Sequence, residues 1–423
     1  MLTGVLIGAG DRGSIYANGL IRRGGKIAAI SEPQRSRLIE AGKAFNVPSD
    51  RLFENDGKLF AVGKIADFAI ISTLDEEHFK PAMKALQVGY DLLLEKPISN
   101  KIEEVLMLAN EAKRLSHQVV VCHVLRYSPF FSTIKQILEE GSLGRIIDIQ
   151  HNENIGNFHF AHSYVRGNWR KEETSSPLIL AKSCHDLDLL LWLTSSSITR
   201  VSSFGSLSYF NAAHAPKDAA DRCVYCPLQE KCRYSAYQVY LPMKGSWPAT
   251  VIGGDQSEEG LKKAIAEGPY GRCVYHCDND VVDHQVSIYE FANGVSATFN
   301  LSAFTDRVSR TVKIMCENGE IRGNEIDNVI EVIPFSSTPN AARSVKIYHP
   351  EIISGAHNGS DNRFIDDFFQ VFSHQKPSDT SIDVSVESHL VAFASEESRH
   401  NHQVVEMEAF RKDLESHLTL KNR

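Results

Sequence analysis

The 423-residue chain lacks the features that mark several classes of protein. No run of 18 uncharged apolar residues occurs, and the start, MLTGVLIGAG, has neither a basic leader nor a long apolar segment. The net charge is only −8, and lysine and arginine nowhere gather with interleaved aromatic residues. We therefore expect a cytoplasmic protein that acts on small molecules and has no membrane or nucleic-acid partner.

The first 123 residues alternate short β-branched runs with helical stretches, which is typical of parallel strands joined by helical crossovers. A helix is expected over His78–Val88, closed by Gly89. This pattern predicts a doubly wound α/β domain over residues 1–123. The expected strands are Gly4–Ile7, Lys26–Ile30, Phe68–Ile71, Asp91–Glu95 and Gln118–Cys122.

Residues 124–423 have a different character and predict a second α/β domain with a mainly antiparallel sheet. Alternating apolar residues predict strands at Val286–Phe291 and Val295–Leu301, after a cysteine-rich insertion at about 215–280. Helical periodicity returns in Arg363–Phe372 and Val386–Arg399. We expect these last helices to pack back on the first domain.

A glycine-rich turn, Gly8-Ala-Gly-Asp-Arg-Gly13, follows the first strand and opens a helix. Gly8 permits the tight turn, Gly10 lets the backbone approach a pyrophosphate, and Gly13 allows helix and strand to pack closely. Glu32, 19 residues later, suits the adenosine ribose and favours NAD over NADP. NADP stays open, because any of three arginines could bind its phosphate, and a glycine turn without a nucleotide is the simpler alternative. The predicted contacts of this turn also include Asp11 and Arg12, and the other two arginines are Arg35 and Arg37.

Two places look suited to hydride-transfer chemistry. Lys96, in Glu95-Lys-Pro97 at the end of a predicted strand, could stabilise alkoxide character on a substrate oxygen; a surface lysine paired with Glu95 is the alternative. A helix introduced by Ser176 as N-cap and Pro177 carries Lys182, His185 and Asp186 at spacings that share one face. His185 could exchange a proton with a hydroxyl, although a histidine satisfied within the fold is also common.

The ordered set of motifs resembles the Gfo/Idh/MocA oxidoreductases, the glucose–fructose oxidoreductase and inositol dehydrogenase family. The resemblance implies a Rossmann domain followed by an α/β domain whose large open sheet forms a homo-oligomer contact, in a dimer or tetramer, and a sugar or polyol substrate. It also implies catalytic roles for Lys96 and His185. The motifs are GAGDRG, Ile71-Ser-Thr73 with His78, Glu95-Lys-Pro97, Leu125-Arg-Tyr-Ser-Pro129, His185-Asp-Leu-Asp188, Glu387-Ser-His389 and Glu397-Ser-Arg399. The predicted cofactor contacts among them are Thr73, His78, Glu95 and Lys96.

One position departs from the family pattern. Many members carry an aspartate four residues before the helix histidine, where this chain has Ala181 followed by Lys182. Lys182, which we include in the catalytic set, would lower the pKa of His185. The substrate could then be acidic or phosphorylated.

A tyrosine, an arginine and a tryptophan in Tyr164-Val-Arg-Gly-Asn-Trp169 suit a polyhydroxylated ring. A surface loop is an equally simple reading of that stretch. The predicted substrate contacts are Arg126, Tyr164, Arg166 and Trp169.

Five of the eight cysteines cluster within the insertion, and thiols should stay reduced in the cytosol. The spacing Cys223-x2-Cys226-x5-Cys232, followed by Cys273-x3-Cys277, predicts a structural zinc site completed by Cys273 or Cys277. The same thiolates could instead bind an iron–sulfur cluster, or remain a set of buried thiols.

These observations predict an NAD(P)-dependent dehydrogenase or reductase acting on a CH–OH group of a sugar, polyol or sugar derivative. Two other functions stay open. One is an NAD-dependent glycosidase that oxidises a sugar transiently and eliminates its substituent. The other is a non-catalytic regulator that senses dinucleotide and sugar.

Overall fold

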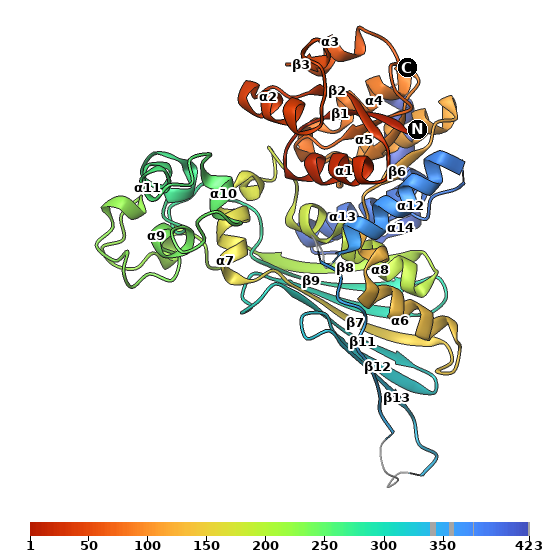
Figure 1. The fold of residues 1–423 in the computed structure, drawn as a ribbon. Coiled ribbons are helices and arrows are strands. Elements are labelled where there is room, and N and C mark those ends of the chain that lie inside the picture. Colours follow the sequence, from red (N-terminus) through yellow and green to blue (C-terminus); the bar gives the residue numbers. More distant parts are fainter. Residues whose placement is uncertain (339–343, 355–358, 375, 422–423) are drawn as a thin grey trace.

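The computed structural model describes residues 1–338, 344–354, 359–374 and 376–421. Two sheets dominate these residues, and Figure 1 shows the smaller one, with its helices, above one end of the larger. No helix among the described residues is long and apolar enough to cross a membrane.

The first sheet contains six parallel strands in the order β3-β2-β1-β4-β5-β6, which confirms the predicted doubly wound domain. All five predicted strands form, and α4 ends at Gly89, whose φ of 101° only glycine adopts readily. The two-residue β3 was not predicted, because two residues carry no periodicity. The strands are β1 Thr3–Ile7, β2 Lys26–Ser31, β3 Leu52–Phe53, β4 Phe68–Ile71, β5 Asp91–Leu94 and β6 Val119–Val121. The helices are α1 Asp11–Arg22, α2 Arg35–Ala44, α3 Asp56–Phe60, α4 Phe79–Val88 and α5 Ile102–Leu115.

The second sheet has nine strands among the described residues, in the order β14-β13-β12-β11-β7-β10-β9-β8-β15. Every neighbouring pair is antiparallel except β7 and β10, so the prediction of a mainly antiparallel sheet is confirmed. The strands are β7 Ile146–Asn154, β8 Ile198–Ser206, β9 His284–Phe291, β10 Ser296–Ser302, β11 Ser309–Cys316, β12 Gly319–Asn324, β13 Val329–Pro334, β14 Lys346–Tyr348 and β15 Val405–Glu406.

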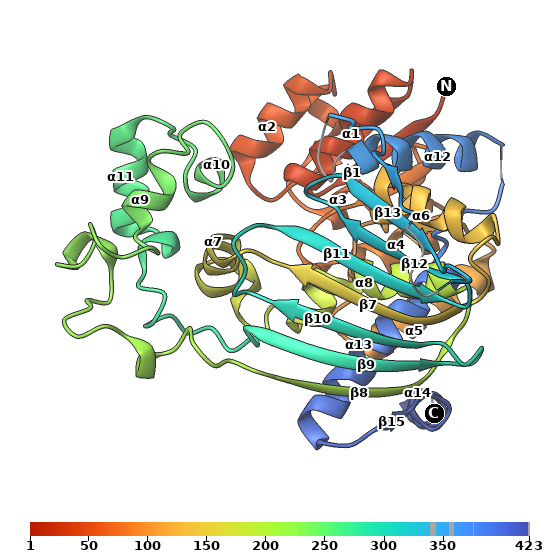
Figure 2. The same ribbon diagram turned by 90° about the horizontal axis from the view of Figure 1, so that it is seen from below.

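Only one face of the larger sheet is covered by helices. That face carries α6 (Pro129–Glu139), α8 (Leu178–Thr194) and α13 (Ile382–Asn401), and Figure 2 shows the opposite face uncovered. The uncovered side of β8 and β9 presents Phe204, Val286 and Ile288, which are 62%, 40% and 49% exposed. The sheet is therefore open, with an apolar patch on the outer face of β8 and β9.

The C-terminal helices return to the first domain. In α12 (Ser360–His374), Phe368 packs edge-on against Phe68 of β4 with ring centroids 4.9 Å apart. In α13, the His389 ring accepts a hydrogen bond from the backbone N–H of Ile98. The last helix, α14 (Met407–Lys421), lies next to β15.

The cysteine-rich insertion lies between β8 and β9 and forms the lobe around α9, α10 and α11 in Figure 1. It has a small core of its own, which includes Tyr240, Leu261 and Ile265. Its helices are α9 Ala236–Tyr240, α10 Ala249–Ile252 and α11 Glu258–Glu267. The segment α7 (Asn157–Phe160) followed by η4 (Ala161–Arg166) precedes α8 in sequence, and η4 contacts this lobe.

Candidate active site

The glycine turn leaves open space at one of its three glycines. A Cβ on Gly8 would lie 2.5 Å from the Ser72 carbonyl oxygen, and a Cβ on Gly13 would lie 2.2 Å from the Gly8 oxygen. A Cβ on Gly10 would meet nothing within 4 Å. Gly10 is also the N-cap of α1 and has no side chain to occupy the first N–H groups, while Asp11 is exposed in the first turn. Gly8 and Gly13 therefore close the turn, and the residues present fit a pyrophosphate over Gly10.

Glu32 lies at the end of β2 beside this turn. Its side chain is buried, and its two oxygens accept hydrogen bonds from the backbone N–H groups of Ala9 and Gln34, both at 3.0 Å. Arg37 approaches it at 3.5 Å. A carboxylate held in this place can still accept from ribose hydroxyls, because each oxygen has more than one lone-pair site.

Arg12 does not face the ribose end of the site. Its guanidinium donates at 2.6 Å to both Glu95 and Asp361, and also contacts Tyr16. This corrects our expectation that Arg12 could bind a 2′-phosphate, because its positive charge is already paired with these two carboxylates. Burial raises the pKa of Glu95, but the charges of Arg12 and Lys96 and the hydrogen bonds from Tyr16 and Arg12 together outweigh it and leave that pKa below its usual value.

Glu95 and Arg12 instead hold the backbone that carries Lys96. The Lys96 N–H donates to the second Glu95 oxygen at 2.8 Å. Lys96 is thus not a surface lysine paired with Glu95, because its ammonium turns the other way. Its Nζ donates to the carbonyl oxygen of Ala181 in α8 at 2.7 Å.

This contact brings the end of β5 to the first turns of α8, where His185 follows Ala181 by one turn. His185 is 5% exposed, and its ring centroid lies 5.6 Å from that of His123. Position 181 has no aspartate, but its backbone carbonyl oxygen accepts the hydrogen bond from Lys96. Lys96 and His185 therefore share one site, although we identified them in segments almost ninety residues apart.

The polar residues of α8 divide between two sides of the helix. Asp186 points to the large sheet, where it accepts from Arg310 of β11 at 2.7 Å and contacts His151 of β7 at 2.8 Å. Lys182 also turns to the sheet and pairs with Glu153 at 3.2 Å. The expected common face of Lys182, His185 and Asp186 is therefore wrong, since His185 faces the first domain. We expected Lys182 to lower the pKa of His185, but the negative charge of Glu153 beside Lys182 offsets the positive charge of the lysine.

The start of α8 differs by one residue from the prediction. Pro177 is the N-cap, and the helix begins at Leu178. The Ser176 hydroxyl does not cap the helix but donates to Asp75 at 3.1 Å. Asp75, just beyond β4, thereby joins the first domain to α8.

Two further histidines lie behind His185. His123 lies between His185 and His389, with ring centroids 5.6 Å and 5.7 Å away. Burial lowers the pKa of His389 to about 3, and burial also lowers that of His123. We did not predict their place at the site, because His123 directly precedes the short helix η3 (Val124–Tyr127), His389 lies in α13, and no spacing in the sequence links them.

His78 and Thr73 shape the edge of the site after β4. One ring nitrogen of His78 lies 2.7 Å from the Pro97 carbonyl oxygen and the other 3.2 Å from the Thr73 oxygen. His78 is buried, so it fastens the turn after β4 to the turn after β5. Thr73 is thereby held beside the glycine turn.

The predicted substrate residues separate into two pairs. Trp169 donates to Asp75 at 3.2 Å, and the centroid of the Tyr164 ring lies 6.2 Å from that of Trp169. Both residues therefore lie near the start of α8, and we call the group they form the wall of the site. Arg126, by contrast, forms a two-pronged ion pair with Asp188 at 2.6 and 2.7 Å. It therefore positions α8 from the side of the first domain.

Arg166 is buried away from the site. It donates to the carbonyl oxygens of Arg272 and Tyr234 in the insertion, at 2.7 and 2.6 Å. This corrects the prediction that Arg166 lines a sugar pocket. Instead, the wall gains His159, whose ring lies 5.0 Å from that of Trp247 of the insertion.

The zinc site predicted in the insertion is not supported. A tetrahedral zinc ion with Zn–S bonds of 2.3 Å sets its sulfurs about 3.8 Å apart. Among the described residues, no three cysteine sulfurs lie within 4.8 Å of one another. All eight cysteines are free thiols.

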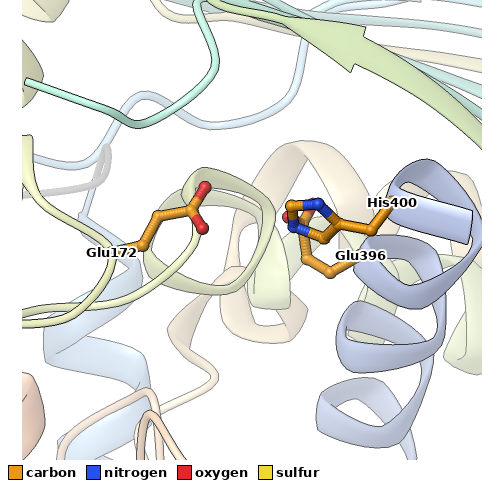
Figure 3. A group of neighbouring side chains, drawn as sticks. All are labelled: Glu172, Glu396 and His400. Carbon is orange, nitrogen blue, oxygen red and sulfur yellow. The ribbon is translucent and has the colours of Figure 1, made fainter.

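One other group has ligand-like side chains, namely Glu172, Glu396 and His400 (Figure 3). Arg399 already lies among them, 2.5 Å from Glu396, 3.5 Å from Glu172 and 2.9 Å from the His400 ring. A guanidinium therefore provides the positive charge at this place. Burial, with the charge of Glu396, raises the pKa of Glu172 to about 7.

Comparison with known proteins agrees with the geometry. A model of the oxidoreductase family with an NAD-binding Rossmann fold, Gfo/Idh/MocA, matches residues 2–123, and the model of its C-terminal α/β domain matches residues 135–407. The chain belongs to this family. As a Gfo/Idh/MocA member it is an NAD-binding oxidoreductase.

Three relatives illustrate the range of the family. The chain is 24% identical over 320 residues to the putative oxidoreductase YteT of Bacillus subtilis (strain 168), covering 72% of each chain. It is 24% identical over 202 residues to inositol 2-dehydrogenase of Corynebacterium glutamicum (strain R), covering 46% of this chain and 55% of that enzyme, so it spans about half the length of this relative. An oxidoreductase from Agrobacterium radiobacter, solved with NAD+, L-tartaric acid and magnesium, shares the fold at 16% identity with a TM-score of 0.70, over 96% of this chain and 99% of that one.

Proposed function

We propose that the protein transfers a hydride between NAD and a hydroxyl-bearing carbon of a sugar, polyol or sugar derivative. The observation that carries the proposal is the 2.7 Å bond from Lys96 Nζ to the Ala181 carbonyl. It joins the strand end beside the glycine turn to the helix that carries His185. An ammonium thereby lies against the helix that carries the imidazole, next to the dinucleotide site.

Each residue has a separate task in this proposal. Bound NAD supplies the hydride acceptor or donor. His185 exchanges a proton with the substrate hydroxyl, and the Lys96 ammonium stabilises negative charge that develops on the same oxygen. In the oxidation direction, Lys96 exchanges the Ala181 carbonyl for the substrate oxygen, which costs little because both are hydrogen-bond acceptors.

The wall of the site suits a polyhydroxylated substrate. Trp169, Tyr164 and the half-buried His159 offer ring faces. The C–H groups of a sugar ring pack on aromatic faces. Because Glu153 offsets Lys182, a neutral sugar or polyol fits as well as an acidic one.

Glu32 supports a preference for NAD. A 2′-phosphate would meet a buried carboxylate whose oxygens already accept two backbone hydrogen bonds. Arg12 is engaged with Glu95 and Asp361, which leaves Arg35 and Arg37 as the cations nearest this end of the site. Replacement of Glu32 by serine should therefore shift the preference toward NADP.

The open face of the large sheet supports a homo-oligomer. Phe204 and Val286 face each other across β8 and β9, and Ile288 lies two residues further along the same face. Exposed apolar side chains in a row on one sheet face are typical of an interface. We propose that a second copy of the chain covers this face.

The test is a screen of sugars, polyols and their phosphates with NAD and with NADP, read by the absorbance of the reduced nicotinamide. Turnover with a sugar or polyol, and a higher kcat/KM with NAD, is the expected result. Product analysis separates simple oxidation from glycoside cleavage. Binding of dinucleotide without turnover on any compound of these classes would instead favour a sensing role.

A further inference from the structure

Four cysteines of the insertion line one cavity in the described structure. They are Cys223, Cys226, Cys232 and Cys273, which come from two segments about forty residues apart. Cys277, four residues after the last of them, does not line it. Apolar and aromatic groups such as Leu228, Val274 and Tyr275 complete the lining.

The spacing of these thiols does not fit a single tetrahedral ion, and a larger centre needs sulfurs that lie further apart. No three of the sulfurs come within 4.8 Å of one another among the described residues, whereas one zinc ion needs about 3.8 Å. A cuboidal four-iron cluster holds its four cysteine sulfurs further apart, because iron and sulfide ions lie between them. Four thiols around one cavity are the ligand set of such a cluster.

A buried positive charge borders the same cavity. Arg166 is 1% exposed, and no carboxylate among the described residues forms an ion pair with it. Its guanidinium lies 3.6 Å from the Cys223 sulfur, which also accepts the backbone N–H of Ala236 at 3.4 Å. A buried guanidinium without a counterion is costly, so an anion is expected at this place. Thiolate ligands on a cluster with net negative charge would supply that anion.

From the cavity and its unpaired guanidinium we infer that Cys223, Cys226, Cys232 and Cys273 bind a [4Fe–4S] cluster. Its role is structural. The two cysteine segments are joined by an isolated bridge between Arg222 and Arg272 and by the Cys273 N–H bond to Asp221, and the region has little other regular structure. A cluster would crosslink them, as metal centres do in small domains with a limited core.

The cluster would also stabilise one wall of the active site. Arg166 ends η4, the same turn of helix that carries Tyr164. Through Arg166, the cluster would hold η4 in place, and the insertion would hold Trp247 against His159. The inference itself does not depend on the proposed substrate or on Lys96 and His185.

The first measurement uses the full-length protein purified without oxygen. We expect about four iron and four sulfide ions per chain, together with a broad visible absorption that dithionite bleaches. Stoichiometric zinc without iron would overturn the inference. So would an absence of metal with freely reactive or disulfide-bonded cysteines after reconstitution with ferrous iron and sulfide.

The second measurement assigns the ligands. Cys226→Ser and Cys232→Ser should each lose most of the iron and the visible absorption. Cys277→Ser is the matched control, because Cys277 is half-buried near the cavity without lining it, and it should keep both. Equal iron in all three variants, or equal loss in all three, would overturn the assigned ligand set. If the serine variants fail to fold, the metal content of the unmutated protein still decides.

Discussion

Alanine at Gly13 should destabilise the fold much more than alanine at Gly10. At Gly13 the new Cβ would lie 2.2 Å from the Gly8 oxygen and 2.6 Å from the Ser72 hydroxyl oxygen, so β1, α1 and the turn after β4 must move apart. Such overpacking costs about 1–3 kcal/mol of unfolding free energy. At Gly10 the Cβ meets nothing within 4 Å, and the backbone (φ −74°, ψ −167°) is one that alanine adopts. Gly10→Ala should therefore change the free energy of unfolding by less than about 1 kcal/mol, because alanine reduces the freedom of the unfolded chain but is a poorer N-cap than glycine.

Gly10→Ala should weaken the binding of NAD although it has little effect on stability. The Cβ of Gly10→Ala enters the space assigned to the pyrophosphate, so affinity should fall at least tenfold, or about 1.4 kcal/mol. Urea unfolding gives the first quantity and calorimetric titration with NAD the second. Gly254→Ala in the insertion is the control, since its Cβ also meets nothing within 4 Å. Parental NAD affinity in Gly10→Ala, or a loss of stability larger than that of Gly13→Ala, would refute the reasoning.

Three other predictions follow from buried charge and exposed apolar surface. Asp186→Asn removes the charge that faces Arg310 and His151 and should cost about 3 kcal/mol in urea unfolding; a loss below 1 kcal/mol would contradict the importance of this ion pair. Because the pKa of Glu172 is raised to about 7, the folded state holds an extra proton between about pH 4.5 and 7, and stability should fall as pH rises through that window. Glu172→Gln should remove this slope, and an unchanged slope would assign it to another group. Ile288→Asp on the open sheet face should lower the oligomeric mass in sedimentation while leaving the fold intact, and an unchanged mass would place the interface elsewhere.

The fold could be predicted well because its signals are local. Each strand of the first sheet is a short apolar run, and Gly8 and the Gly89 cap have a left-handed backbone conformation that few residues adopt. The long strands β9 and β10 alternate cleanly because one face is buried and the other is open. By contrast, β3 has two residues, and no periodicity can be read from them.

The site could be predicted only as far as single elements allow. Lys96 and His185 were found because each lies at a strand end or on a helix with an unusual polar residue. The partners of the site residues depend on packing between elements: Glu153, which pairs with Lys182, comes from β7, and the Ala181 carbonyl that binds Lys96 carries no sequence signal at all. The same limit explains why the prediction for Arg166 was wrong. The aromatic residues near it in the sequence suggested a sugar pocket, but its guanidinium binds the insertion.

The central claim is that Lys96 and His185 act in chemistry and not in holding the dinucleotide. The most direct test measures turnover and NAD affinity of Lys96→Ala and His185→Ala with a sugar or polyol that the parent protein oxidises. Each variant should bind NAD like the parent and lose turnover by roughly 10²-fold or more, the usual scale for removing an acid–base or electrostatic group. Near-parental turnover in His185→Ala, or a loss of NAD binding that accounts for the defect in Lys96→Ala, would contradict the account.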